Sequence, residues 1–231
     1  MQLEERSPRA SRETVALAMY AVAYVAYLFW NPEGELFHWI TLVAIPAGVV
    51  AVAGRYRSQR EVLRSVGLTK QTAQGWWLAG GFAIAFQVIQ LANRTQRATL
   101  SAVFSAPSRL YVVPLAFVLL LGTAATTEEF FFRGLLQTRF ATVCKSEAAG
   151  VALATLAFIA YHVPYAYLKW PSAGNARAAW EAAVTNALVA GVPLGLVYWR
   201  SRHNLLPAIF LHASIDLLPA VGMLASRFGM S

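Results

Sequence analysis

The amino-acid sequence predicts an all-α protein, a polytopic transmembrane bundle of about seven helices. Of its 231 residues, 58% are hydrophobic and only 13% are charged, whereas soluble domains are about 45–50% apolar and about 25% charged. Apolar windows of the length that crosses a bilayer, about 20 residues, recur along the whole chain. No stretch has the mixed composition of a separate globular unit. We therefore expect residues 1–231 to form a single membrane-embedded domain.

Seven apolar windows are the expected spans, and an eighth, re-entrant or less apolar segment would raise the number to eight. The fourth window is expected to continue as a helix to about Phe140, because the residues that follow it keep a helical pattern. The windows are residues 14–30, 36–54, 75–92, 110–132, 148–165, 179–199 and 205–226.

The distribution of Lys and Arg predicts a cytoplasmic N-terminus, because cytoplasmic loops of membrane proteins are enriched in these residues. Six cations fall on the side opposite the N-terminus: Arg94, Arg97, Arg109, Lys169, Arg177 and Arg227. Thirteen fall on the N-terminal side: Arg6, Arg9, Arg12, Arg55, Arg57, Arg60, Arg64, Lys70, Arg133, Arg139, Lys145, Arg200 and Arg202. With seven spans the C-terminus would lie outside.

The net charge of +8 is also explained by membrane topology, since the cations lie between apolar runs and not on one polar face. We therefore expect no nucleic-acid partner, and membrane lipid is the expected environment. The basic stretch 55–69 carries apolar residues among its arginines, which is compatible with an amphipathic helix on the inner leaflet or with a plain basic loop.

Five ionisable residues lie within apolar windows and not at their ends, where such residues are costly and normally mark function. They are Glu128, Glu129, His162, His212 and Asp216, the only aspartate in the chain. The other eight acids lie in the tail, in loops or at the ends of the windows. The sequence thus places five such groups on three predicted helices, and it predicts that they share one site.

The run Glu-Glu-Phe-Phe-Phe-Arg in the fourth window contains an i,i+4 pair, Glu129 and Arg133, which can hold Glu129 ionised. Glu128 points to another side of the helix, where burial disfavours the charged carboxylate and suits it to accept a proton. A purely structural interpretation, in which both acids neutralise Arg133, stays open.

The two buried histidines have neighbours at helical spacing. Phe158 lies one turn before His162, and Asp216 lies one turn after His212, so each pair can share a helix face. Either histidine alone would be explained as a hydrogen-bonded core residue. Together with the two glutamates they indicate a cavity lined by acids and histidines.

These residues resemble the three motifs of the CAAX-protease and bacteriocin-processing (CPBP) family of intramembrane proteases. The first motif, Glu-Glu-x-x-x-Arg, is complete and continues as Gly-Leu-Leu-Gln. The second, Phe-x-x-x-His, and the third, His-x-x-x-Asn/Asp, are also present. The sequence Asn-Leu-Leu-Pro at 204–207 is similar to the family as well. The resemblance covers residues 110–219, which we take as the motif-bearing catalytic core.

The resemblance implies a peptidase in which Glu128 and His162 activate a water, and His212 and Asp216 stabilise or orient the oxyanion. Glu129, Arg133 and Phe158 would support them. Asp216 stands where the family also uses Asn, and an ionised carboxylate cannot donate a hydrogen bond to an oxyanion. Asp216 would then be protonated, orient His212 or bind another group.

No cofactor is expected to be obligatory, and zinc is the alternative. Glu128, His162 and His212 would be its ligands, although the His-Glu-x-x-His signature is absent. A serine or cysteine mechanism lacks any motif.

The resemblance implies a protein or peptide substrate, lipid-modified or membrane-anchored in some members. The form of the motifs favours peptide or protein maturation over CAAX processing, and a multi-pass protein of the bacterial inner membrane. Two other functions stay open: a catalytically silent membrane scaffold, and a proton-coupled transporter, for which the acids would have to occupy both halves of the chain.

Overall fold

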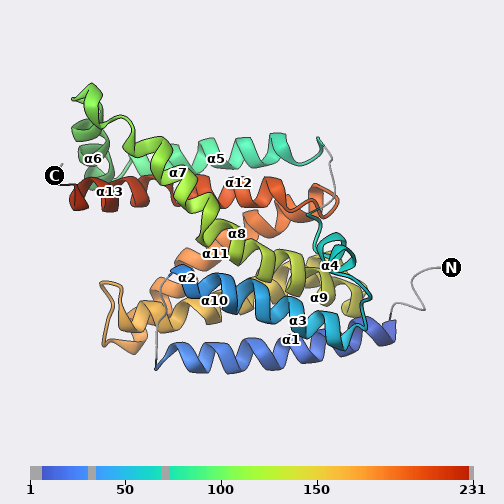
Figure 1. The fold of residues 1–231 in the computed structure, drawn as a ribbon. Helices are drawn as coiled ribbons and strands as arrows, with labels where there is room; N and C mark the ends of the chain where they lie inside the picture. The colour runs from blue at the N-terminus through green and yellow to red at the C-terminus, as the bar shows by residue number, and fades with distance from the viewer. Residues whose placement is uncertain (1–6, 31–34, 69–72, 229–231) are drawn as a thin grey trace.

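The computed structural model describes residues 7–30, 35–68 and 73–228, and every regular element in these ranges is helical (Figure 1). Arg6 and Lys70, two of the cations counted for topology, lie outside them. The first half of the chain contains α1 (Ser7–Leu28), α2 (Glu35–His38), η1 (Trp39–Ala44), α3 (Ile45–Ala53), α4 (Gln59–Ser65), α5 (Trp76–Leu91), α6 (Arg94–Phe104) and η2 (Pro107–Arg109). The second half contains α7 (Val112–Gly122), α8 (Ala124–Glu129), η3 (Phe130–Gln137), α9 (Thr138–Cys144), α10 (Glu147–Leu168), α11 (Ala176–Arg200), α12 (Leu206–Ile215) and α13 (Leu217–Arg227).

Each of the seven predicted windows coincides with a helix or with a run of consecutive helices. Three helical segments are long and apolar enough to cross a membrane, namely Pro107–Cys144, Glu147–Leu168 and Ala176–Arg200. The bent pair α12 and α13 is a fourth if it forms one broken span and not a re-entrant loop. The helical, membrane-spanning class is confirmed, and the number of seven spans stays a prediction. The start of α1 and the end of α13 lie on opposite sides of the molecule (Figure 1).

The boundaries of several helices follow from side-chain caps in the sequence. The side chains of Ser58, Asn93, Ser146 and Asn175 each accept a hydrogen bond from a backbone N–H in the first turn of α4, α6, α10 and α11. The cap at Ser58 begins a short helix, α4, inside the basic stretch 55–69, so this part is not a plain loop, and its position on the inner leaflet stays a prediction. Val62 of this helix and Val66 after it are buried, and the arginines point outward.

Helices α10 and α11 pack closely because α11 presents a row of small residues to its neighbours. Buried small side chains recur at every fourth position: Ala179, Ala183, Ala187, Gly191 and Gly195. A Cβ atom on Gly195 would lie 2.9 Å from Cγ1 of Val151 on α10. Small residues at this spacing are the usual way for transmembrane helices to approach each other.

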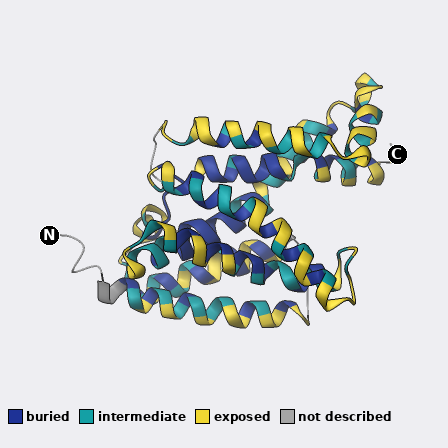
Figure 2. Cartoon of the chain, turned by 180° about the vertical axis from the view of Figure 1, so that it is seen from behind, coloured by how far each residue is buried: buried dark blue, intermediate teal, exposed yellow. Residues whose placement is uncertain are grey.

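The outer faces of the bundle are apolar, as a lipid-facing surface requires. In Figure 2 the buried positions lie towards the middle of the bundle, while the outer helices α1 and α5 carry exposed stripes. Large apolar side chains occupy these stripes, including Val22 on α1, 72% exposed, and Trp77 on α5, 93% exposed. The fold thus carries apolar side chains on its outer surface as well as in its core.

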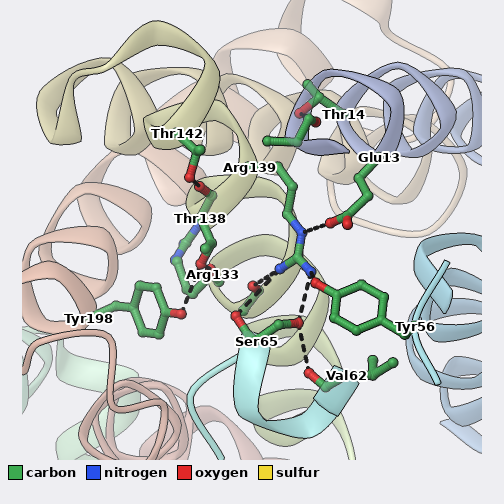
Figure 3. A network of polar contacts seen from close by, with 12 residues as sticks. Glu13, Thr14, Tyr56, Val62, Ser65, Arg133, Thr138, Arg139, Thr142 and Tyr198 are labelled. Carbon is green, nitrogen blue, oxygen red and sulfur yellow. Dashed lines mark hydrogen bonds and ion pairs between the residues drawn. The ribbon is translucent and has the colours of Figure 1, made fainter. Parts of the chain in front are cut away.

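One buried arginine ties together three segments at the end of the bundle where α1 begins. Nε of Arg139 donates to Glu13 at 2.9 Å, and its other nitrogens reach Ser65, Tyr56 and the carbonyl of Gly134 (Figure 3). Both charged side chains are buried. Glu13 lies near the start of α1, at the end of the first predicted window, but it is buried there and Arg139 compensates its charge.

Arg133 and Arg139 were counted as cations of the inner side, but both are buried in the bundle. The topology count without them is eleven against six, so its direction is unchanged.

The fourth and seventh windows are not single straight α-helices. The fourth continues through Phe140 as predicted, but it is interrupted at Thr123 (φ −128°, ψ −112°) and becomes a π-helix in η3. The seventh bends by 51° between α12 and α13, at Asp216. Both irregular segments adjoin the ionisable residues singled out in the sequence.

Candidate active site

Glu128 and Glu129 form the end of α8, directly before the π-helix η3, and both are buried. A π-helix has i→i+5 backbone hydrogen bonds, and short π-helical turns are frequent at functional sites. Here the hydroxyl of Thr138 donates to the carbonyl of Arg133 at 3.3 Å, and the guanidinium of Arg139 donates to that of Gly134 at 3.0 Å. These bonds stabilise the irregular backbone that directs the acid pair into the bundle.

Glu129 bridges Arg133 and His212. Its Oε2 lies 3.3 Å from Nε of Arg133, which is the i,i+4 ion pair that the sequence predicted, and both side chains are fully buried. Its Oε1 accepts a hydrogen bond from Nδ1 of His212 at 2.8 Å. The Arg133 guanidinium also stacks on Phe158, with Cζ 5.0 Å from the ring centroid. Glu129 therefore connects two helices through one carboxylate.

His212 on α12 faces carboxylates from two segments of the chain. With Nδ1 bound to Glu129, its Nε2 lies 3.3 Å from Oδ2 of Asp216 and 3.8 Å from Oε2 of Glu128. The contact with Glu128 is longer than a hydrogen bond and within ion-pair distance. Nε2 of His212 thus lies near one carboxylate of the first motif, Glu128, and one of the third, Asp216.

Asp216 lies at the bend, where its own N–H donates to the carbonyl of His212 and its carbonyl accepts from Ala220. Its side chain is 42% exposed, compared with 6% for His212. Glu128 and Glu129 are also buried, so Asp216 is the most accessible of these carboxylates. A ligand from outside would reach the cluster along this side.

His162 joins the cluster through Phe158. The Phe158 ring contacts the imidazoles of His162 and His212 edge-on, with centroids 4.4 Å and 6.2 Å away. Nδ1 of His162 lies 2.8 Å from the carbonyl oxygen of Phe158. Because a carbonyl only accepts, Nδ1 carries the proton, and Nε2 of the neutral ring is an acceptor.

Sequence reasoning missed Tyr161, which donates to Oε1 of Glu128 at 3.4 Å. Its ring also packs against Phe132 on η3, with centroids 5.3 Å apart. One turn further on α10, the hydroxyl of Tyr165 lies 3.1 Å from Nε2 of His38. The sequence did contain a signal for this contact: Tyr161 directly precedes His162, and Tyr165 follows Tyr161 at i+4.

Four further side chains that sequence reasoning missed bind backbone carbonyls at the helix breaks. Nε1 of Trp39 donates to Gly122 at 2.9 Å, and the hydroxyl of Thr126 donates to Leu121, both at the break before α8. At the other break, Gln87 donates to Ser214, and Gln90 donates to Ile215 at 2.6 Å. The sequence signal for Gln87 and Gln90 was that two amide side chains stand at i,i+3 in an otherwise apolar window.

The arrangement does not fit the zinc set named from the sequence. Within residues 7–30, 35–68 and 73–228, no three His, Cys, Asp or Glu side chains are placed so that they could hold a metal ion. We therefore derive no step through a metal.

Comparison with known families adds an independent result. A family model described as type II CAAX prenyl endopeptidase, Rce1-like, matches residues 109–218. This range contains all three motifs and the cluster around His212. Searches of curated proteins and of solved structures gave no match.

Proposed function

Because the chain belongs, through residues 109–218, to the CPBP family of intramembrane proteases, we propose that it is an intramembrane endopeptidase that hydrolyses a peptide bond near the membrane. The observation that carries the proposal is the convergence of Glu128, Glu129 and Asp216 on His212, with His162 one ring away. Ionisable groups are unfavourable inside a membrane bundle unless they have such partners.

In the proposed reaction, Glu128 takes a proton from the attacking water. Its Oε1 is held by Tyr161, so its Oε2 is the oxygen directed towards His212. His162 offers an acceptor at Nε2, which orients the same water. A positioned general base contributes about 10²–10⁴-fold to such a rate.

His212 is proposed to stabilise the oxyanion. In the proposal His212 is an imidazolium with a proton on both ring nitrogens, because each nitrogen faces a carboxylate. Glu129, paired with Arg133, holds the Nδ1–H, and the Nε2–H is the donor that faces the reacting carbonyl. Removal of one oxyanion donor in other enzymes costs about 10²–10³-fold in kcat.

Asp216 is proposed to position His212, since a carboxylate accepts the Nε2–H and cannot donate to the oxyanion. Its exposed side chain can turn away when the substrate carbonyl enters. This assignment explains why either Asn or Asp is compatible with the motif.

The proposed step conserves atoms and protons. The water oxygen forms a bond to the carbonyl carbon while its proton passes to Glu128. The oxyanion collapses, the C–N bond breaks, and the amine leaves with the proton returned by Glu128. The products are a carboxylic acid and an amine, and no co-reactant is needed.

The proposed substrate is a protein or peptide presented at the membrane, such as a lipid-modified C-terminus, a maturing peptide or a C-terminal sorting tail. The exposed apolar faces support a lipid environment. The excess of cations where α1 begins supports a cytoplasmic N-terminus, and the form of the motifs supports a bacterial inner membrane. Residues 110–219 would be the catalytic core.

The test is cleavage of a peptide library, including prenylated peptides, by purified protein in liposomes. Glu128→Gln, His162→Ala and His212→Ala should each lower kcat by at least about 100-fold. His203→Ala and Glu181→Gln are the matched controls, because both side chains are partly exposed and lie in ion pairs away from the cluster. Their kcat should stay within about twofold of the wild type.

If Glu128→Gln cleaves as fast as the wild type, the proposed mechanism is wrong. If the wild type cleaves nothing in a library that spans all three substrate classes, the scaffold interpretation replaces the peptidase.

A further inference from the structure

The bend at Asp216 leaves one backbone carbonyl without its helical donor. In a continuous α-helix the carbonyl of Ile215 would accept the N–H of residue 219. Residue 219 is a proline, which has no N–H, and α12 and α13 meet at 51°. Because lipid supplies no donors, this carbonyl needs one from a neighbouring segment.

Two glutamines on α5 supply donors to this part of the backbone. Nε2 of Gln90 lies 2.6 Å from the carbonyl oxygen of Ile215, and Nε2 of Gln87 donates to Ser214. The glutamines are one turn apart and bind consecutive carbonyls. The carbonyls only accept, so the amide nitrogens must face them. Packing of Trp76 on Phe210, with ring centroids 5.7 Å apart, keeps α5 against α12.

The two carbonyls lie between the members of the third motif. Ser214 and Ile215 follow His212 and precede Asp216, so the direction of this backbone sets how the two functional side chains meet. Their present contact is 3.3 Å. Helix α5 lies outside residues 109–218, the range that the family model matches.

We propose that Gln87 and Gln90 are positioning residues: by binding the carbonyls of Ser214 and Ile215, α5 holds the bend that places His212 and Asp216 opposite Glu128. The catalytic consequence rests on the proposed function. The effect on the bend does not, and it can be measured separately.

The bend is tested by pulsed EPR distances between spin labels at positions 206 and 223, which lie in α12 and α13 and are both exposed. Cys144 is replaced by serine so that only these sites react. Gln87→Leu/Gln90→Leu should lengthen or broaden the distance distribution. Asn186→Leu is the matched control, because that exposed amide binds a carbonyl of its own helix, and it should leave the distribution unchanged.

Catalysis is tested with the single and double glutamine variants. Gln90→Leu should lower kcat about 10- to 100-fold with KM nearly unchanged, because small misplacements of catalytic groups have effects of this size. In a Pro219→Ala background, residue 219 regains its N–H, and Gln90→Leu should then change kcat less than about threefold.

An unchanged distance distribution in the double variant would overturn the proposal. A changed distribution with unchanged kcat would overturn the positioning role, provided that Glu128→Gln is inactive. If Glu128→Gln is as active as the wild type, the proposed mechanism fails, and the EPR result alone decides whether α5 holds the bend. If the double variant does not fold, the same distance and kcat measurements are made on Gln87→Leu alone.

Discussion

Replacing Arg133 by methionine should destabilise the bundle, because it removes the guanidinium partner of the Glu129 carboxylate in a fully buried position. Methionine keeps most of the volume and the contact with Phe158, while it removes the guanidinium whose Nε lies 3.3 Å from Glu129. The remaining partner of the carboxylate is Nδ1 of His212. The change therefore tests electrostatics with little loss of packing.

The expected magnitude follows from the distance. Two unit charges 3.3 Å apart interact by about 5 kcal/mol at an effective dielectric constant of 20. Breaking a buried pair by removing one partner typically costs about 3–5 kcal/mol, since the remaining charge keeps its desolvation penalty. We expect Arg133→Met to lower the free energy of unfolding by roughly 3 kcal/mol or more.

The assay is thermal and denaturant unfolding in detergent, followed by tryptophan fluorescence, which the seven tryptophans of the chain make sensitive. A second variant, Glu129→Gln/Arg133→Met, removes both charges. It should recover at least about half of the lost stability, because a neutral pair has no stranded charge. Arg133→Lys is the third variant, and it should be intermediate because it keeps the charge but not the planar fork.

The reasoning would be refuted if Arg133→Met were as stable as the wild type, or if the double variant were less stable than the single one. Either result would mean that the Glu129 carboxylate is not ionised in the folded protein.

Three further predictions concern the site and its support. Glu129→Gln should lower kcat about 10²-fold while the protein stays folded, because the Nδ1–H of His212 loses its carboxylate partner. Peptide cleavage measures the change in kcat, and an unfolding curve of the same variant is the control for folding. Glu13→Gln should lower the free energy of unfolding by about 1–3 kcal/mol, because it weakens the partner of Arg139 at the start of α1. It should leave the kcat of the folded fraction unchanged, because Arg139 keeps its bond to the carbonyl of Gly134 that supports η3. Chelators should leave peptide cleavage unchanged, and loss of activity that zinc alone restores would show that a metal takes part.

The class of fold and the site residues were accessible from the sequence for one physical reason: ionisable side chains are rare in apolar windows. Glu128, Glu129, His162, His212 and Asp216 stood out on that ground, and the structure brings them together. The i,i+4 pair of Glu129 and Arg133 was predictable because helical spacing is local. Their catalytic roles stay predictions.

Other contacts could not be predicted, because they depend on how distant helices approach each other. The pairing of Arg139 with Glu13 spans the chain from α9 to α1, and the sequence offers no spacing that connects them. The bonds from Gln87 and Gln90 to α12 are of the same kind. Apolar content shows that a segment spans the membrane, whereas it does not show which face meets which neighbour.

Composition and local spacing, then, determined by themselves that this chain is a helical membrane protein whose acids inside apolar windows lie in its second half, on helices that also carry His162 and His212. Only the tertiary structure decided that His212 lies between the carboxylates of Glu128, Glu129 and Asp216, and that the last span bends at Asp216. The reason is that hydropathy and helical periodicity act along the chain. The sequence alone shows which carbonyl loses its hydrogen-bond donor to a proline. The side chain that donates to this carbonyl instead comes from another helix, and only the tertiary structure shows which one.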